Sequence, residues 1–333
     1  MRFFVKWGFV VLAFVMAFSL CCTPLAQAEE VVYLGGVPLA ISVNTQGLSV
    51  LGLCEVETAD GEVSPAKEAG VAVGDLIRAI DGRVVNSRED VQKALDDAQG
   101  HTVTLAVERD GRSTYLMITP RWDVAIEGWR LGMYLKDSVD GIGTLTFVQG
   151  DRFGALGHCI TTGGESDPMP ISGGEIYSTT VASIVKGKSG SAGSLVGGQH
   201  AKDKAGEIES NTVFGVFGRA TPALVKGLKP VAVANPKSVH KGQAHIYTTV
   251  DETGPHLYEV EITDVKRSRK PDVKGISLKV VDPALIELTG GIVQGMSGSP
   301  ILQDGRLVGA VTHVVVADPT LGYGVFAQYM LGR

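Results

Sequence analysis

The sequence is poor in cysteine, in aromatic residues and in extended basic patches, and each shortage excludes a class of protein. Only four cysteines occur among 333 residues, and Cys21 and Cys22 belong to an N-terminal leader. The remaining two, Cys54 and Cys159, do not make a disulfide framework, so hydrophobic cores must hold the fold. Aromatic residues make up 6% of the chain, and the net charge is −6. An acidic chain without concentrated Lys and Arg is a poor candidate for nucleic-acid binding.

Long apolar runs are scarce as well. The sequence has one, and it lies at the N-terminus. Arg2 and Lys6 precede an apolar run from Gly8 to Leu20, and Ala26-Gln27-Ala28 is a small-x-small cleavage motif. The run is shorter than the about 20 residues of a spanning helix, although extension to Leu25 allows an uncleaved anchor. We expect residues 1–28 to be a signal peptide or an N-terminal membrane anchor of an exported protein.

Glycine is abundant, and its distribution predicts short strands joined by tight turns. The chain has 43 glycines, most of them between short runs of Val, Ile and Leu. Within residues 31–120, Asp81-Gly82 is a hairpin signal. Ser87 can cap a helix over residues 88–98, with Asp90 at the capping-box position. The fold class predicted for the whole chain is therefore mainly β.

The motifs of residues 31–120 resemble those of a PDZ domain. They are Ser64-Pro65-Ala66, Ala69-Gly70-Val71, Gly74-Asp75-Leu76-Ile77, Ile80-Asp81-Gly82 and Glu89-Asp90. A PDZ domain binds an extended peptide as an additional strand beside its long helix. The resemblance implies that residues 37–43 receive this peptide opposite residues 87–98. The groove residues would be Leu39, Ile41, Val43, Val91 and Leu95. The alternative is a PDZ-shaped spacer without a ligand.

The rest of the chain predicts an interdomain linker over residues 121–130 and an all-β domain over residues 131–333. The linker holds two of the three tryptophans. The following 200 or so residues alternate short apolar runs with glycine-rich turns, which suits a double barrel or a sandwich. A basic run, Lys266 to Lys270, is a solvated hairpin loop, or alternatively a site of self-cleavage or partner contact.

The sharpest chemical signal is Gly295-Met296-Ser297-Gly298-Ser299-Pro300. A serine becomes a nucleophile when a base takes its proton, and the attacked carbonyl needs donors for its developing negative oxygen. A glycine-flanked turn exposes the hydroxyl of Ser297, and the amides of Gly295 and Ser297 can form an oxyanion hole. A predicted hairpin over residues 300–312 would hold this turn rigid.

The base should be a histidine, and two of the seven histidines are candidates. His158 lies in a small-residue apolar turn early in the same domain, directly before Cys159. His313 lies in an apolar strand after the serine and is the second candidate, although it could also be a core residue. Cys159 is a poor candidate for the nucleophile, because Ser297 already lies in a glycine-flanked turn that exposes its hydroxyl.

Several further motifs resemble those of the stage IV sporulation B (SpoIVB) peptidases of endospore-forming bacteria, and the resemblance covers nearly the whole chain. They are Leu131 to Tyr134, Gly141 to Phe147, Gly154 to His158, Gly295 to Pro300, Gly309 to Val314, Asp318-Pro319 and Gly322 to Val325.

In that family the catalytic order is histidine, aspartate, serine, which implies His158, Asp282 and Ser297. From the residues alone, Asp251, Asp264 and Asp272 compete with Asp282 for the role of orienting the imidazole. The turn after the histidine departs from the family pattern at Cys159 and at Thr161-Thr162.

The resemblance implies a PDZ domain followed by a chymotrypsin-like double β-barrel and a role in sporulation signalling. Such a serine endopeptidase cleaves itself and a membrane-tethered regulatory protein of an intramembrane protease, between the forespore and mother-cell membranes. That cleavage releases activation of a late sigma factor. Two alternatives are a quality-control peptidase of the HtrA kind, which normally carries its PDZ domain after the peptidase, and a non-catalytic PDZ adaptor. No cofactor or metal is predicted, and the PDZ ligand could be a segment of the same chain.

Overall fold

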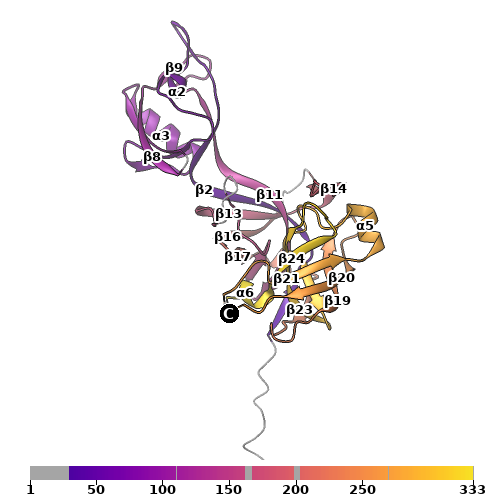
Figure 1. The fold of residues 1–333 in the computed structure, drawn as a ribbon. Helices are drawn as coiled ribbons and strands as arrows, with labels where there is room; N and C mark the ends of the chain where they lie inside the picture. The colour runs from indigo at the N-terminus through magenta and orange to yellow at the C-terminus, as the bar shows by residue number, and fades with distance from the viewer. Residues whose placement is uncertain (1–29, 110, 162–166, 199–202, 269, 333) are drawn as a thin grey trace, which may run out of the picture. The chain divides into compact units, whose positions relative to one another are not determined.

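The computed structural model describes residues 30–332, apart from residues 110, 162–166, 199–202 and 269. Within these ranges, short strands dominate and form two closed barrels and one smaller PDZ-like domain (Figure 1). The predicted leader, residues 1–28, lies outside the described residues. None of the helices in the described part of the chain has the length and apolar character needed to cross a membrane.

The first barrel is a ring of six strands that closes because β11 pairs with both β12 and β2. Alternate residues of β2, namely Leu39, Ile41 and Val43, point into its core together with Phe153 and Ile176. A strand places successive side chains on opposite faces, so this alternation buries one face of β2 inside the barrel. In ring order the strands are β2 (Pro38–Leu53), β11 (Met133–Gln149), β12 (Arg152–Ala155), β17 (Gly215–Ala220), β16 (Lys204–Thr212) and β13 (Ile171–Ser178).

Smaller elements extend or cover the first barrel. The strand β1 pairs with β11 and with β18, and the hairpin of β14 and β15 reaches the second barrel, where Leu195 donates its amide to the carbonyl of Gln294 at 2.8 Å. These elements are β1 (Val31–Leu34), β14 (Val181–Val185), β15 (Ser194–Gly197), α4 (Pro222–Val225) and β18 (Lys229–Ala232).

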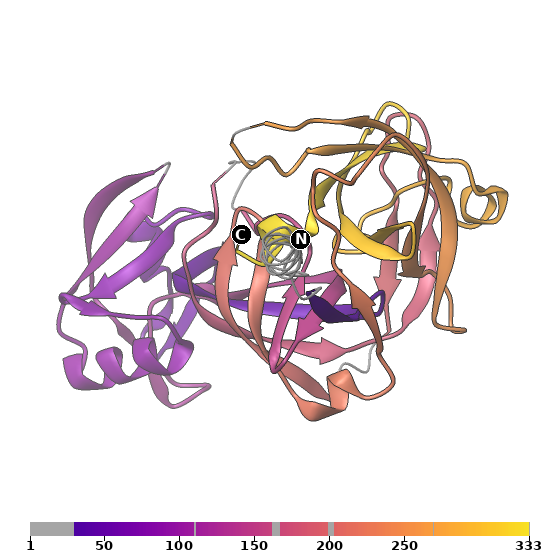
Figure 2. The same ribbon diagram turned by 90° about the horizontal axis from the view of Figure 1, so that it is seen from below.

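The second barrel is formed by the C-terminal third of the chain, and its strands curve around a common interior in orange and yellow (Figure 2). Ile246, Val260, Ile262, Leu278 and Ile301 are fully buried in its core. In ring order its strands are β19 (Gly242–Thr249), β20 (Pro255–Val265), β21 (Ile276–Val280), β24 (Leu321–Phe326), β23 (Arg306–Val314) and β22 (Pro300–Gln303). Two helices accompany them, α5 (Pro283–Thr289) and α6 (Ala327–Met330).

The PDZ-like domain has its own core, built around the amphipathic helix α3. Ser87 caps this helix and shares a capping box with Asp90, which confirms the sequence prediction. Val91 and Leu95 face the domain core. The elements are β3 (Val56–Thr58), β4 (Gly61–Val63), α2 (Pro65–Glu68), β5 (Leu76–Ile80), β6 (Arg83–Val84), α3 (Arg88–Ala98), β7 (Val103–Arg109), β8 (Arg112–Ile118), β9 (Arg121–Asp123) and β10 (Gly128–Arg130).

Two long strands, β2 and β11, belong to both the first barrel and the PDZ-like domain. The first half of β2 pairs with β13 of the barrel, whereas Leu48 in its second half pairs with Ile77 of β5. β11 runs antiparallel to β2 from Met133, opposite Leu53, to Thr144, opposite Pro38. The PDZ-like domain is thus an insertion between two barrel strands. The predicted division into a domain over residues 31–120 and a barrel domain starting at residue 131 is therefore wrong, because the first half of β2 belongs to the barrel and β1 pairs with the barrel strand β11. The predicted linker over residues 121–130 is wrong as well, because β9 and β10 form a hairpin there and Trp129 packs against the PDZ-like core.

Candidate active site

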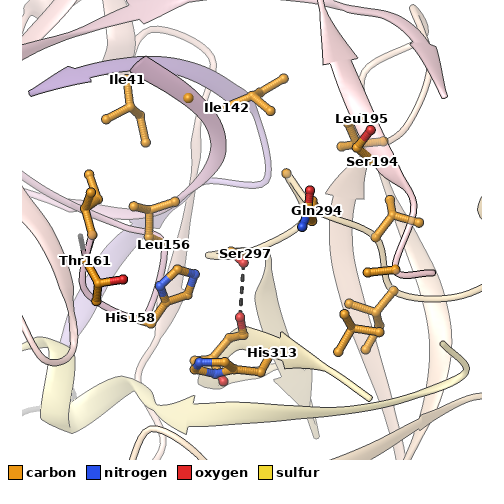
Figure 3. A pocket seen from close by; sticks show the side chains of 18 of the residues that line it. Ile41, Ile142, Leu156, His158, Thr161, Ser194, Leu195, Gln294, Ser297 and His313 are labelled. Atoms are coloured by element: carbon orange, nitrogen blue, oxygen red, sulfur yellow. Dashed lines mark hydrogen bonds between the residues drawn. The ribbon is translucent and has the colours of Figure 1, made fainter. Parts of the chain in front are cut away.

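The turn that carries Ser297 lies at the start of the second barrel's β22, and two glycines shape it. Gly295 and Gly298 have φ angles of 96° and 94°, which side-chain-bearing residues rarely adopt. A Cβ atom at Gly298 would also collide with the carbonyl oxygen of Thr144. The hydroxyl of Ser297 donates a hydrogen bond to the backbone carbonyl of Thr312 at 3.1 Å (Figure 3).

The first barrel holds this turn through two threonines of β11. Thr144 donates its backbone amide to the carbonyl of Ser297 at 2.9 Å and its hydroxyl to the carbonyl of Gly295 at 2.8 Å. Thr146 donates its hydroxyl to the carbonyl of Gly298 at 2.7 Å. Because these bonds are buried, they fix the turn more firmly than exposed bonds would. Nothing near these threonines in the sequence points to the turn, which lies about 150 residues further along the chain.

His158 follows β12 in a turn whose two preceding residues have left-handed backbone conformations. The φ angles of Leu156 and Gly157 are 70° and 71°. Nδ1 of His158 lies 2.8 Å from the carbonyl oxygen of Cys159. A carbonyl only accepts hydrogen bonds, so Nδ1 must carry the proton, which leaves Nε2 free to act as a base. Burial lowers the pKa of His158 below its ordinary value, although its hydrogen bond to Cys159 opposes the shift.

Ser297, His158 and His313 all line one cavity of about 670 Å³, and the imidazole of His158 is seen beside Ser297 in Figure 3. The ring centroids of His158 and His313 are 5.2 Å apart. The pKa of His313 is lowered to about 4, first by burial and then by the charges of His158 and Lys274. Its Nδ1 is buried and has no hydrogen-bond partner among the described residues. The structure therefore brings both candidate bases to the candidate nucleophile.

The structure does not bring Asp282 to His158, so its catalytic role stays a prediction from the family resemblance. It is the N-cap of α5, where Oδ1 accepts the amides of Ala284 at 2.9 Å and Leu285 at 3.1 Å. Its Oδ2 accepts the amide of Glu259 at 3.1 Å. The cavity lining does not include it. The physical reason is local, because an aspartate followed by proline is a strong helix start.

None of the three competing aspartates lines the cavity either. Asp251 accepts hydrogen bonds from Thr253, Asp264 forms an ion pair with Lys241 at 2.9 Å, and Asp272 accepts the amide of Lys274 at 2.9 Å. Of the described residues that line the cavity, only Asp140 is acidic. Its carboxylate accepts the hydroxyl of Ser42 at 2.6 Å and pairs with Lys136 at 3.0 Å. In the described structure, the partner of His158 is thus a backbone carbonyl.

Three of the five predicted PDZ-groove residues lie elsewhere. Leu39, Ile41 and Val43 are buried in the first barrel, where β2 is paired on both sides, and Ile41 also lines the cavity that contains Ser297. An extended peptide cannot pair with a strand whose two edges are both occupied. The prediction that residues 37–43 receive a peptide is therefore wrong. Val91 and Leu95 do lie on α3, on its inward face.

The strand beside α3 is the beginning of β11. Met133 and Leu135 pack against the core that contains Val91 and Leu95, and Arg88 of α3 lies 3.9 Å from Asp137. Over residues 133–138 the ladders of the described structure pair β11 with β2 alone, so its other edge carries no strand. The free strand edge beside α3 is thus on β11, a strand that the sequence prediction placed in the peptidase domain.

Comparison with known proteins decides the family. The model of the SpoIVB peptidase S55 family matches residues 127–331, and that of the PDZ domain matches residues 61–109. The chain belongs to the SpoIVB peptidase S55 family. It is accordingly a serine endopeptidase with a PDZ domain, and the resemblance stated from its motifs is confirmed. The S55 match begins at residue 127, although β1 and β2 of the same barrel precede the PDZ domain.

Other similarities are partial. Metalloprotease MmpA of Caulobacter vibrioides is 38% identical over 86 residues, which is 25% of this chain and 22% of the relative. The matched segment thus spans about a fifth of that protein. The Rv3671c protease of Mycobacterium tuberculosis in its inactive form is 16% identical, with a TM-score of 0.34, over 57% of this chain and 81% of that chain. Its active form is 14% identical, with a TM-score of 0.33, over 58% and 72%. The double-barrel fold of this S55 peptidase rests on its own strand order.

Proposed function

We propose that this S55 peptidase is a sporulation signalling protease in which Ser297 is the nucleophile and His158 is the general base. The observation that carries the catalytic assignment is that both side chains line one cavity, with the Nδ1 proton of His158 held by a carbonyl. Burial lowers the pKa of His158 and so favours the neutral imidazole near pH 7, whose Nε2 can accept a proton.

Catalysis begins when the hydroxyl of Ser297 leaves the carbonyl of Thr312 and turns to Nε2 of His158. The serine oxygen attacks the scissile carbonyl carbon while its proton passes to His158. Collapse of the tetrahedral intermediate breaks the C–N bond, and His158 returns the proton to the leaving amine. A water molecule then hydrolyses the acyl-enzyme by the same two steps, which restores Ser297 and releases the new carboxyl terminus.

The amides of Gly295 and Ser297 are the proposed oxyanion donors. Within the described residues, neither amide has a protein acceptor, whereas the neighbouring amides of Met296, Gly298 and Ser299 donate to backbone carbonyls. An unpaired amide in the nucleophile turn is a donor held ready for a charge that develops only in the transition state. Full pairing of the neighbouring amides keeps the turn rigid.

The cavity supports a substrate with an uncharged aliphatic side chain near the scissile bond. Leu195, Ile292, Val293, Val314 and Val316 line it, and Leu195 lies across from Ser297 in Figure 3. Each buried aliphatic side chain gains about 1.5–3 kcal/mol from leaving water, whereas a charged side chain would lose its hydration without a partner. Peptide bonds beside Val, Leu or Ile are therefore the expected targets.

The proposed biological substrates are a membrane-tethered regulatory protein and the chain itself, and the proposed location is the space between the forespore and mother-cell membranes. Support comes from membership of the family and from the leader expected over residues 1–28. The PDZ domain would bring the substrate in by pairing an extended peptide with the free edge of β11 beside α3. Cleavage of the regulator would then trigger activation of a late sigma factor.

The test is labelling of the purified protein with a fluorophosphonate, followed by sequencing of fragments formed on incubation. Wild-type protein should be labelled and should cleave itself. Ser297→Ala should fold and show neither reaction, because losing the nucleophile costs several orders of magnitude in rate. His158→Ala should be as inactive, and His313→Ala should retain labelling. An active His158→Ala together with an inactive His313→Ala would transfer the role of base to His313.

A further inference from the structure

Asn211, at the end of β16, makes three hydrogen bonds to the loop that follows His158. Its Oδ1 accepts the amide of Ile160 at 2.9 Å. Its Nδ2 donates to the carbonyl of Ile160 at 2.8 Å and to the carbonyl of Met169 at 3.0 Å. A side-chain amide has one oxygen acceptor and two N–H donors, so both ends of Asn211 are used on this loop.

These bonds fix the backbone on the C-terminal side of His158. Ile160 directly follows Cys159, whose carbonyl holds the Nδ1 proton of His158. On the N-terminal side, Gly157 donates its amide to the carbonyl of Ala155 at 2.9 Å. The position of the imidazole therefore depends on a tight turn before it and on Asn211 after it.

We propose that Asn211 is a positioning residue for the general base, which acts by fixing Ile160 and, through it, the carbonyl of Cys159 that orients His158. This inference rests on the proposed role of His158. Asn211 does not touch the reacting atoms, and its effect passes through the backbone alone.

The chemistry of the three bonds requires an amide and excludes its isosteric acid. An aspartate at position 211 could still accept the amide of Ile160. Its second oxygen would, however, face the carbonyls of Ile160 and Met169, where two donated hydrogen bonds would be replaced by repulsion between acceptors. Asn211→Asp therefore preserves shape and removes the function, whereas Asn211→Ala removes all three bonds without adding charge.

The experiment measures the second-order rate constant of fluorophosphonate labelling from pH 4.5 to 8.5, with a thermal melt of each variant. For Asn211→Ala we expect a 10- to 100-fold slower reaction of folded protein. We also expect the acid limb of the profile to move to higher pH, because a loosened loop exposes His158 to water and returns its pKa toward the ordinary 6.5. With a short peptide substrate, kcat should fall and KM should change little.

The pH profile must account for the other titratable groups around His158. His313 of β23 contacts the ring, Cys159 is adjacent, and Asp140 of β11 lines the same cavity. The charge of Lys274 lowers the pKa of His313, whereas the charge of Asp272 raises it. All of these remain in Asn211→Ala, so a displaced acid limb reports the environment of His158. The same limb should move further in Asn211→Asp, where a negative charge is added near the loop.

Asn86→Asp is the matched control, since Oδ1 of Asn86 also accepts a backbone amide, that of Gly47 at 3.1 Å, within the PDZ domain. It should label at the wild-type rate. Folded Asn211→Ala with a labelling rate within twofold of wild type, or a slower rate with an unmoved acid limb, would overturn the proposal. Should Asn211→Ala not fold, the same criteria apply to Asn211→Asp. Failure of the wild type itself to label would instead refute the proposed function.

Discussion

Thr144 of β11 donates its backbone amide to the carbonyl oxygen of Ser297 at 2.9 Å, so a strand of the first barrel holds the proposed nucleophile carried by the second. The same threonine bonds Gly295 through its hydroxyl. The two glycines of the nucleophile turn leave its conformation soft unless something outside the turn holds it. In this peptidase the geometry of the catalytic turn is therefore a property of both barrels packed together.

Replacing Thr144 with valine tests this dependence. Valine keeps the shape and the backbone bond but leaves the buried carbonyl of Gly295 without its donor, which costs about 1–3 kcal/mol. We expect fluorophosphonate labelling of folded Thr144→Val to fall about tenfold. Thr45→Val is the control, because the buried hydroxyl of Thr45 also bonds a glycine carbonyl, that of Gly47, outside the catalytic cavity. Equal labelling by the two valine variants would show that β11 does not tune the turn.

The Asp282→Asn variant distinguishes a capping role of this residue from a catalytic role. In Asp282→Asn the amide oxygen can still cap α5, whereas the amide of Glu259 loses its acceptor. We expect a loss of about 1 kcal/mol in the free energy of unfolding. The labelling rate per folded molecule should stay within about threefold of wild type. A stable, folded Asp282→Asn that has lost labelling by several orders of magnitude would restore the aspartate to the catalytic set.

The sequence predicted local features well where one motif has one physical meaning. The capping box of Ser87 and Asp90 is such a case, and so is the serine flanked by two glycines. Asp282 is less certain from sequence, because Asp282-Pro283 is both a helix start and a family landmark, and the motif alone does not separate the two roles. Asn211 was not identified, since its partners, Ile160 and Met169, lie far from it in the sequence.

The domain boundaries were mispredicted for a related reason. The apolar alternation of Leu39, Ile41 and Val43 is the same whether the strand lies in a PDZ domain or in a barrel. β2 continues unbroken for 16 residues, from the barrel into the PDZ-like domain. Only pairing partners distinguish these possibilities, and partners are set by long-range contacts. The roles of His158 and Ser297 themselves stay predictions, although one cavity holds both.

The location of the PDZ groove can be tested by hydrogen exchange with a bound peptide, chosen from overlapping segments of the protein's own sequence. Addition of a binding peptide should slow exchange at residues 133–138, where β11 has a free edge, because new interstrand hydrogen bonds protect its amides. Exchange at residues 39–43 should not change, since β2 is already paired on both sides there. Protection confined to residues 39–43 would refute the assignment of the groove to β11.

The stability of the peptidase should depend on pH through His313. Its pKa is about 4 when folded, against an ordinary 6.5, so between these values the unfolded chain binds more protons than the folded one. Stability should then fall as pH drops from 6.5 toward 4. The ring is partly exposed, so solvent screening reduces this contribution to about 1–2 kcal/mol.

His313→Gln should flatten the pH dependence of the melting temperature over this range. A smaller dependence should remain, because burial also lowers the pKa of His158. His240→Gln is a control of opposite sign, because the carbonyl of Lys241 and then Asp304 raise the pKa of His240. A raised folded pKa adds stability below the unfolded pKa, so removing His240 should steepen the loss at acid pH. Identical melting profiles for wild type and His313→Gln from pH 4 to 6.5 would mean that His313 titrates alike in the folded and unfolded chain, and that the cavity is open to water at its ring.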